Sequence, residues 1–205
     1  MSDEEKVSVT VLLSGGRLSL ELMAEVHRVA ARYGLGIYLT TLQNVRLYNI
    51  PKSKAEAVKQ ELAAAGAEFK APGKFPLPRV CIGEDACNLG LIDTMCLSEK
   101  IVGRFHDKQH TKAKFKIAVA GCQLCCSSPK TTDIGVVATR DGYELYAGGK
   151  GGPFPKTGRR IGQKLTEDQV VEMIEALVSF HDHKTLKKQR MYKLLSDPEF
   201  PYPEL

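Results

Sequence analysis

Four cysteines in two close pairs constrain this 205-residue chain more than any other feature. Five residues separate Cys81 from Cys87, three separate Cys122 from Cys126, and 34 residues lie between the two pairs. A fold that brings the pairs together presents soft thiolate ligands, which suit an iron–sulfur cluster or a zinc ion. Zinc sites commonly use gaps of roughly two to four residues. The unequal gaps therefore favour a 4Fe–4S cluster and leave zinc as the alternative.

The composition favours metal over disulfides as the explanation for the cysteines. Hydrophobic residues make up 43% of the chain and charged residues 26%, which is ordinary for a globular protein. The N-terminus is polar, without an apolar stretch behind a basic one, and no apolar run approaches the roughly 20 residues that span a bilayer. We therefore expect a cytoplasmic protein without membrane contact, in which thiols stay reduced.

The net charge of +5 suits an anionic partner. Lysine and arginine are spread along the chain, and aromatic residues, which form stacking platforms for single strands, make up only 7% of it. We therefore expect no nucleic acid partner. Arg79, Lys114 and Lys116 come shortly before the two cysteine pairs, which predicts a small oxyanion bound beside the metal centre.

The pattern of residues 1–70 predicts an α+β unit of ferredoxin-like type. Apolar residues recur at helical spacing between Ser19, a suitable N-cap, and Gly34, a suitable stop. Ser53 and Glu56 predict a capping box for a second helix. The strands are expected at residues 7–13, 37–42 and 45–50, and the helices at residues 20–33 and 53–65.

Prolines and glycines at residues 71–78 predict the joint between a first subdomain, residues 1–70, and a second α+β subdomain, residues 71–205. The second subdomain contains the cysteines and ends in helices. Its expected elements are a helix over 86–102, a strand over 115–120, a hairpin of 133–139 and 143–147, and a last helix capped by Thr166.

The cysteine gaps and their flanks resemble the sirohaem-containing sulfite and nitrite reductases. The cluster motif of that family is C-x5-C followed by C-x3-C, and this chain matches both gaps. Larger members carry the module twice, whereas this chain carries it once, like the low-mass, assimilatory-type sulfite reductases. The resemblance covers residues 7–180 and includes Ser14-Gly15-Gly16, Leu39-Thr40-Thr41-Leu42-Gln43, Lys114-Phe115-Lys116, Asp133-Ile134-Gly135 and Tyr146-Ala147-Gly148-Gly149.

The resemblance implies roles for individual residues. The implied ligands of the 4Fe–4S cluster are Cys81, Cys87, Cys122 and Cys126. Cys126 would also bridge to the iron of a sirohaem, on whose open face sulfite binds. The implied cations around the bound anion, here taken as catalytic, are Arg79, Lys114 and Lys116. The implied cofactor-binding residues are Thr40, Thr41, Gln43, Arg46 and Cys126.

Several positions depart from the family pattern. Leu42 stands where the family has an arginine in a Thr-x-Arg-Gln segment, and Thr10 stands where a further arginine is expected on the first strand. Arg46 matches a position that faces the cofactor and is expected to supply the missing cation. Gln123 and Leu124 replace the usual Pro-Asn between the second pair.

The expected function is the six-electron reduction of sulfite to sulfide, with electrons from a ferredoxin-like or other donor protein. Nitrite reduction to ammonia is the alternative for the same site. A non-catalytic electron-transfer protein with the same cofactors is a second alternative, and a zinc-stabilised binding module is a third. The single module also predicts a homodimer. Cys96 and Cys125 are expected to be packed thiols rather than ligands.

Overall fold

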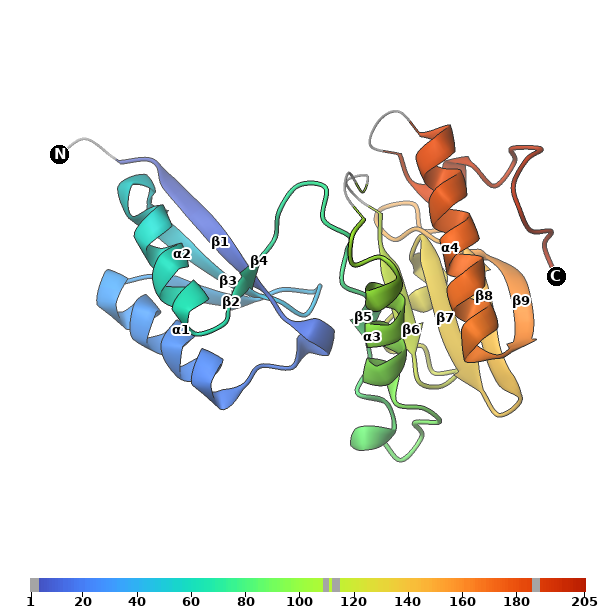
Figure 1. Cartoon of the computed structure of the whole chain (residues 1–205), viewed down its shortest axis with the longest axis horizontal. Helices are drawn as coiled ribbons and strands as arrows, with labels where there is room; N and C mark the ends of the chain where they lie inside the picture. The colour runs from blue at the N-terminus through green and yellow to red at the C-terminus, as the bar shows by residue number, and fades with distance from the viewer. Residues whose placement is uncertain (1–3, 109–110, 112–114, 186–188) are drawn as a thin grey trace. The chain divides into compact units, whose positions relative to one another are not determined.

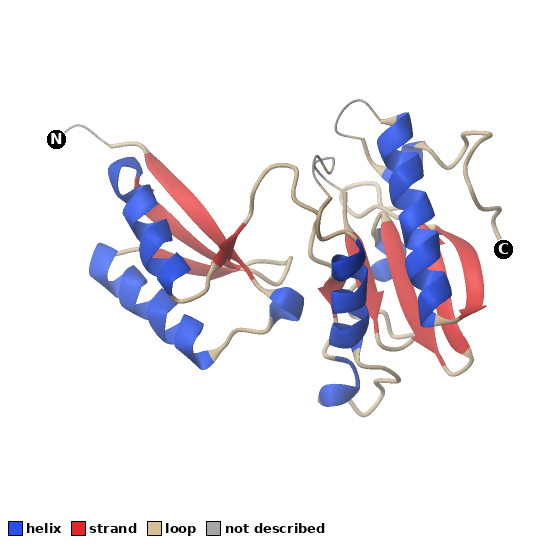
Figure 2. Cartoon of the chain, viewed as in Figure 1, coloured by secondary structure: helices blue, strands red, loops and turns tan. Residues whose placement is uncertain are grey.

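The computed structural model describes residues 4–108, 111, 115–185 and 189–205 (Figure 1). The chain divides into two compact units, Met1–Ala71 and Pro72–Leu205. Each unit combines helices with one β-sheet, so the predicted α+β class is confirmed (Figure 2). Within the described ranges, no helix is both long enough and apolar enough to cross a bilayer.

The first unit is a four-stranded antiparallel sheet with two helices on one face (Figure 1). Its strand order, β2-β3-β1-β4, and its β-α-β-β-α-β sequence are those of a ferredoxin-like fold, as predicted. The elements are β1 (Lys6–Leu12), α1 (Leu20–Tyr33), β2 (Gly36–Leu39), β3 (Val45–Pro51), α2 (Ala55–Ala64) and β4 (Glu68–Phe69).

Helix α1 begins and ends at the residues that the sequence predicts. The Ser19 hydroxyl accepts a hydrogen bond from the Leu22 backbone N–H at 3.1 Å, which satisfies one of the free donors of the first turn. Gly34 adopts a φ of 63°, the left-handed conformation that commonly ends a helix. The apolar face of the helix contributes the buried Val26 and Val29 to the core of the unit.

The capping box predicted for α2 is wrong. Ser53 lies in a short 3-10 turn before the helix, and its backbone N–H donates to the Glu4 carboxylate at 3.0 Å. Helix α2 begins at Ala55, after Lys54, without a side-chain cap. The carboxylate that satisfies the backbone at Ser53 therefore comes from the N-terminal segment and not from Glu56.

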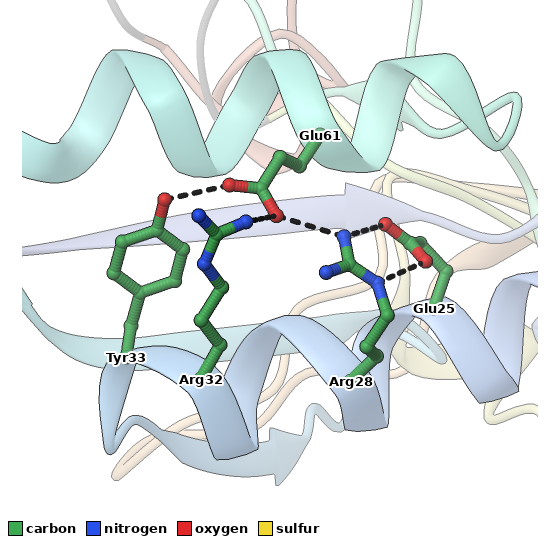
Figure 3. Close-up of polar contacts among 5 residues, drawn as sticks. All are labelled: Glu25, Arg28, Arg32, Tyr33 and Glu61. Carbon is green, nitrogen blue, oxygen red and sulfur yellow. Dashed lines mark hydrogen bonds and ion pairs between the residues drawn. The ribbon is translucent and has the colours of Figure 1, made fainter.

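A network of ion pairs and hydrogen bonds connects the outer faces of α1 and α2 (Figure 3). Glu61 pairs with Arg28 at 2.8 Å and Arg32 at 3.2 Å, and it accepts a hydrogen bond from the Tyr33 hydroxyl at 2.6 Å. Arg28 also pairs with Glu25 at 2.6 Å. The hydrogen bond from Tyr33, followed by that from Arg28, lowers the pKa of Glu61. Because these groups face solvent, the network orients the helices more than it stabilises the fold.

The second unit is a five-stranded mixed sheet in the order β5-β6-β7-β8-β9. The pairings β5–β6 and β6–β7 are parallel, and the pairings β7–β8 and β8–β9 are antiparallel. Helices α3 and α4 lie on the same face of this sheet (Figure 1). The elements are β5 (Arg79–Val80), α3 (Thr94–Arg104), β6 (Ile117–Ala120), β7 (Ile134–Thr139), β8 (Gly142–Ala147), β9 (Arg159–Leu165) and α4 (Glu167–Lys184).

In the second unit one expectation needs correction, one strand was not predicted, and one expectation is confirmed. The helix predicted over 86–102 starts at Thr94, because the Asp93 carboxylate caps it by accepting hydrogen bonds from two backbone N–H groups at 2.8 and 3.0 Å. Strand β9 was not predicted, since its polar and basic residues lack apolar alternation. Thr166 caps α4 as predicted, in a capping box with Gln169.

Gly135 allows β7 to pack directly against the chain that follows the second cysteine pair. A Cβ at this position would lie 2.1 Å from the carbonyl oxygen of Pro129, which is backbone and cannot swing aside. We expect Gly135→Ala to lower the free energy of unfolding by about 1–3 kcal/mol through overpacking. Urea denaturation followed by circular dichroism measures this loss.

The matched control is Gly103→Ala, at an exposed position of α3 where a Cβ would meet no described atom within 4 Å. Helix propensity predicts that this change is neutral or stabilises the protein by up to about 1 kcal/mol. Equal destabilisation by the two substitutions would contradict the close packing of β7.

Candidate functional site

The parallel pairing of β5 and β6 brings both cysteine pairs to one edge of the sheet. Cys81 comes directly after β5, and Cys122 comes two residues after β6 ends. The register pairs Val80 with Val119, and the Cys81 backbone N–H donates to the Val119 carbonyl at 3.3 Å. The two pairs therefore start from neighbouring points at the carboxyl ends of adjacent strands, where sites in α/β sheets commonly lie.

Gly121 connects the loops of the two pairs. Its backbone N–H donates to Cys81 Sγ at 3.1 Å, and its carbonyl accepts from the backbone N–H of Leu91 at 2.9 Å, on the loop that follows Cys87. A Cβ at position 121 would lie only 3.1 Å from Thr94 Cγ2, so the absence of a side chain permits this approach. Backbone donation to a cysteine sulfur is also a type of contact that tunes iron–sulfur clusters.

The second pair lies on two consecutive β-turns. The Cys125 backbone N–H donates to the Cys122 carbonyl at 3.3 Å, and the Ser128 N–H donates to the Cys125 carbonyl at 2.7 Å. Cys125 adopts a φ of 57° where the turns meet, a conformation that favours glycine. Directly after Cys126 the Ser127 hydroxyl donates to the Val119 carbonyl of β6 at 2.7 Å, so the turns return the chain to the sheet.

The four paired cysteines fit a cluster by their chemistry and position. Cys81, Cys87 and Cys122 are half-buried, and Cys126 is exposed. In the part of the chain that the structure describes, no three Cys, His, Asp or Glu side chains already converge as metal ligands. What the fold supplies is four thiols on two loops that hydrogen bonds through Gly121 join at one sheet edge.

Exposed apolar side chains follow the same loops. Ile82 is 48% exposed, Leu89 57%, Leu91 42% and Leu124 66%. Each lies within four residues of a paired cysteine. Large exposed apolar groups gathered on functional loops are typical of a surface that a ligand or a partner covers.

Arg79 holds the segment that leaves the second pair. Its Nε donates to the Ser127 carbonyl at 2.6 Å, and Nη2 lies 3.5 Å from the Ser128 carbonyl and 3.4 Å from Thr132 Oγ1. Partial burial lowers the pKa of Arg79, although a guanidinium stays charged at physiological pH. Arg79 thus fixes the loop after Cys126, in addition to the anion-binding role predicted for it.

The structure does not bring the Lys116 backbone to the cysteine edge. Lys116 is exposed directly before β6, and its carbonyl accepts from the Ile134 N–H at 3.2 Å. The four residues of β6 that separate it from Gly121 span about 13 Å at about 3.3 Å per residue. Lys116 and Cys122 therefore start from opposite ends of one buried strand. Lys114, the other predicted lysine, lies outside the described residues.

The predicted cofactor residues of the first unit lie in a turn. The strand expected over 37–42 ends at Leu39, because the Thr40 N–H donates to the Asn44 carbonyl at 2.8 Å and Thr40 Oγ1 accepts from the Asn44 N–H at 3.1 Å. Thr41 is exposed in this turn, and Gln43 adopts a φ of 60°. A hollow of about 220 Å³ adjoins it, lined by Leu13, Gly15, Gly16, Leu39, Thr40, Gln43 and Asn44.

Arg46 lies on the sheet face that the helices do not cover. It is exposed on β3, directly opposite Thr10 of β1 and Tyr38 of β2. Its neighbours in the strand, Val45 and Leu47, are buried and face the helices. The cation of Arg46 thus stands beside the position where the family pattern led us to expect an arginine and the chain has Thr10.

Sequence reasoning missed some residues that shape the site and misjudged one thiol. Gly121 was not singled out, although a glycine directly before a candidate ligand is a typical sign of close backbone approach. Asn44 was not singled out as a site residue either, although its side-chain carbonyl accepts the Leu13 N–H at 3.0 Å beside the hollow. Cys96 is exposed, so its expected packing is wrong, whereas Cys125 is half-buried and burial raises the pKa of its thiol.

Comparison with protein families decides the relationship of the chain. Residues 77–198 match the nitrite and sulphite reductase 4Fe-4S domain, and residues 1–65 match the nitrite/sulfite reductase ferredoxin-like half domain. The chain belongs to the nitrite and sulfite reductase family. The cysteine edge of the sheet lies inside the matched 4Fe-4S domain, and the turn around Thr40 lies inside the ferredoxin-like half domain.

Relatives within the family include enzymes of both kinds. The chain is 26% identical over 190 residues to a nitrite reductase [NAD(P)H] of Emericella nidulans, which covers 92% of the chain and 17% of that protein. It is 27% identical over 186 residues to an assimilatory-type sulfite reductase of Nitratidesulfovibrio vulgaris, covering 88% of the chain and 82% of that protein. The chain thus spans less than a quarter of the nitrite reductase and most of the sulfite reductase.

Solved structures share the fold. The Mycobacterium tuberculosis NirA protein superposes with a TM-score of 0.74 at 21% identity, over 92% of this chain and 37% of that one. Dissimilatory sulfite reductase I gives a TM-score of 0.74 at 12% identity, over 91% of this chain and 65% of that one. These two solved structures therefore have the same fold as this chain.

The contacts of Arg79 with loop carbonyls generate a stability prediction. Arg79→Lys keeps the charge but loses the donors at Nε and Nη2, and we expect it to lower the free energy of unfolding by about 1–2 kcal/mol. Urea denaturation of the metal-free protein measures the change. Arg140→Lys, at the exposed turn between β7 and β8, should stay within about 0.5 kcal/mol of wild type. If both variants match wild type, Arg79 does not hold the loop.

Proposed function

We propose that this chain reduces sulfite to sulfide at a 4Fe–4S cluster and a sirohaem, in the cytoplasm, with electrons from an external donor protein. The observation that carries the proposal is the pair of cysteine loops joined through Gly121 at one sheet edge, with the gaps C-x5-C and C-x3-C. The similarity to the assimilatory-type sulfite reductase, 27% identical over 186 residues, supports sulfite as the substrate.

The proposed cluster ligands are Cys81, Cys87, Cys122 and Cys126. Cys126 is the most exposed of the four and is proposed also to face the sirohaem. When bound, these two groups supply the electrons and an iron that takes the oxyanion. The apolar side chains on the cysteine loops suit the flat face of a macrocycle, and the net charge of +5 suits its carboxylates.

The protein's own part in the reaction is to neutralise charge and supply protons. Removing a sulfite oxygen as water requires both, and preorganised cations lower the cost of the charge that develops. We propose that Lys114 and Lys116 bind the oxyanion and donate protons, as ammonium groups can. Arg79 is proposed to contribute its positive charge and to keep the loop after Cys126 in place.

Binding of the sirohaem carboxylates is proposed for four residues of the first unit. Thr40, Thr41 and Gln43 offer hydroxyl and amide donors in one turn, beside the hollow that this turn lines. Arg46 offers a cation on the uncovered sheet face. Its place opposite Thr10 supports the proposal that it replaces the arginine that the family has on the first strand.

Nitrite reduction to ammonia is the second candidate for the same site. Nitrite reductase large subunits support it, since that of Klebsiella oxytoca is 29% identical over 185 residues. A ferredoxin–nitrite reductase of Leptolyngbya laminosa, 25% identical over 184 residues, supports a ferredoxin-like donor. Leu42 and Thr10, where arginines are expected, support the third candidate, a carrier of electrons without turnover. A homodimer is also proposed, and light scattering of the purified protein tests it.

Cofactor content separates these proposals from a zinc-binding module. Protein expressed and purified without oxygen, with sirohaem supplied, should show a Soret band, a band toward the red, and about four irons and four sulfides per chain in addition to the haem iron. Cys87→Ser should lose the cluster. Cys96→Ser, at an exposed cysteine outside the pairs, should keep it. A colourless protein that holds zinc would contradict the proposal.

Steady-state rates with reduced viologen test the substrate and the lysines. We expect turnover of sulfite with a higher kcat/KM than for nitrite. Lys116→Ala should lower kcat/KM for sulfite by about tenfold or more and leave the visible spectrum unchanged, because it removes only charge and a proton donor. Lys164→Ala is the matched exposed control. Loss of the spectrum in Lys116→Ala would show a role in folding or cofactor binding instead.

A further inference from the structure

The loop of the second cysteine pair carries an additional thiol, which a cluster with four cysteine ligands does not use. Cys125 lies between Cys122 and Cys126, and the C-x3-C spacing passes over it. Cys122 and Cys125 are the first and fourth residues of a β-turn, closed by the hydrogen bond from the Cys125 N–H to the Cys122 carbonyl at 3.3 Å. The backbones of the two cysteines are thus neighbours in space as well as in sequence.

The turn places these cysteines within disulfide range. The Cα atoms of the first and fourth residues of a β-turn lie less than about 7 Å apart. Disulfides bridge Cα atoms that are roughly 4.4–6.8 Å apart. Both thiols are half-buried, so a small reagent can reach them. The turn therefore needs little rearrangement to hold a disulfide.

Hydrogen bonds hold the backbone at Cys125 and at the residues that follow it. The Ser128 N–H donates to the Cys125 carbonyl at 2.7 Å, and Arg79 binds the next carbonyls along the chain, those of Ser127 and Ser128. Cys125 is kept at a φ of 57°, where a side chain costs free energy that a glycine would not. A thiol at a strained backbone position suggests a function for that thiol.

We propose that, in the chain without its cluster, Cys122 and Cys125 form a reversible disulfide that withholds Cys122 from cluster assembly. The proposal rests on the assignment of Cys122 as a cluster ligand in the proposed function. A sulfur that is bonded to another sulfur is not a thiolate and does not ligate iron. Oxidising conditions would thereby block cluster assembly by removing one of its four ligands, Cys122, and reduction would restore assembly.

The oxidant required is a low-molecular-weight disulfide such as oxidised glutathione. One protein thiolate attacks a sulfur of the oxidant, which forms a mixed disulfide and releases one small thiol. The second protein thiolate then attacks the mixed disulfide, forms the Cys122–Cys125 bond and releases the second small thiol. Two cysteine thiols are oxidised, one small disulfide is reduced to two thiols, and the two protons pass to those thiols.

Thiol mapping of the full-length, cluster-free protein tests the disulfide directly. The chain is incubated with oxidised glutathione, alkylated, reduced and alkylated again with an isotopically heavier reagent. Fragmentation of the peptide from Ile117 to Lys130, which holds all three thiols, then shows which of them were protected. We expect the heavy label on Cys122 and Cys125 and the light label on Cys126. Light label on Cys125, or a bond between Cys126 and either neighbour, would overturn the proposal.

Cluster reconstitution tests the consequence. After oxidised glutathione, wild type should take up at least about tenfold less iron and sulfide than the reduced protein, and dithiothreitol should restore uptake. Cys125→Gly, which suits the positive φ, and Cys125→Ser should take up the cluster with or without that treatment. Cys96→Ser should behave as wild type. If oxidised glutathione lowers cluster uptake by the Cys125 variants as much as by wild type, the proposed disulfide does not control assembly.

The two proposals fail in distinguishable ways. If the fully reduced wild type takes up no iron and sulfide, the proposed function fails. The proposed control of cluster assembly by the disulfide then fails with it, whatever the thiol mapping shows. If reduced wild type takes up the cluster but glutathione leaves Cys125 free, only the disulfide proposal fails.

Discussion

The structure of the candidate site depends on the two hydrogen bonds of Gly121. The N–H of this residue binds the Cys81 sulfur, and its carbonyl binds the loop after Cys87. On the Gly121 side both bonds are made by backbone groups, and because this residue has no side chain, the loops can approach. One residue thus joins the segments that carry the two cysteine pairs.

The parallel pairing of β5 and β6 provides the frame for that contact. Parallel strands present the segments after their carboxyl ends at a common edge, which is where Cys81 and Cys122 lie. The same strand direction places Lys116 at the other end of β6. Arg79, on β5, binds the loop that leaves the second pair, so this arginine contributes to the geometry of the cysteine edge.

Local chemistry explains how much of this could be predicted from the sequence. Ser19, Gly34 and Thr166 end or begin helices through contacts with residues close in sequence, and the sequence predicted all three. The cysteine gaps are also a local pattern, and they predicted the family correctly. The start of α3 was predicted wrongly because the helix was expected to begin at the first cysteine pair. A loop follows that pair instead, and the Asp93 carboxylate caps the helix.

Features set by tertiary structure could not be read from local patterns. The cap expected at Ser53 failed because Glu4, 49 residues away, satisfies that backbone. Lysines only six and eight residues before Cys122 were expected beside it, but a buried strand separates at least Lys116 from the cysteine edge. The spacing in the sequence predicts which thiols act together, and that stays a prediction, whereas strand direction decides which cations start near them.

X-ray absorption spectroscopy of the anaerobically purified protein tests the central claim most directly, because it reports the element and its neighbours at the cysteine site. We expect an iron edge with sulfur neighbours and short iron–iron distances, as in a cluster. In Cys122→Ser we expect the sulfur neighbours and the short iron–iron distances to be lost. A zinc edge with only sulfur neighbours at about 2.3 Å would contradict it.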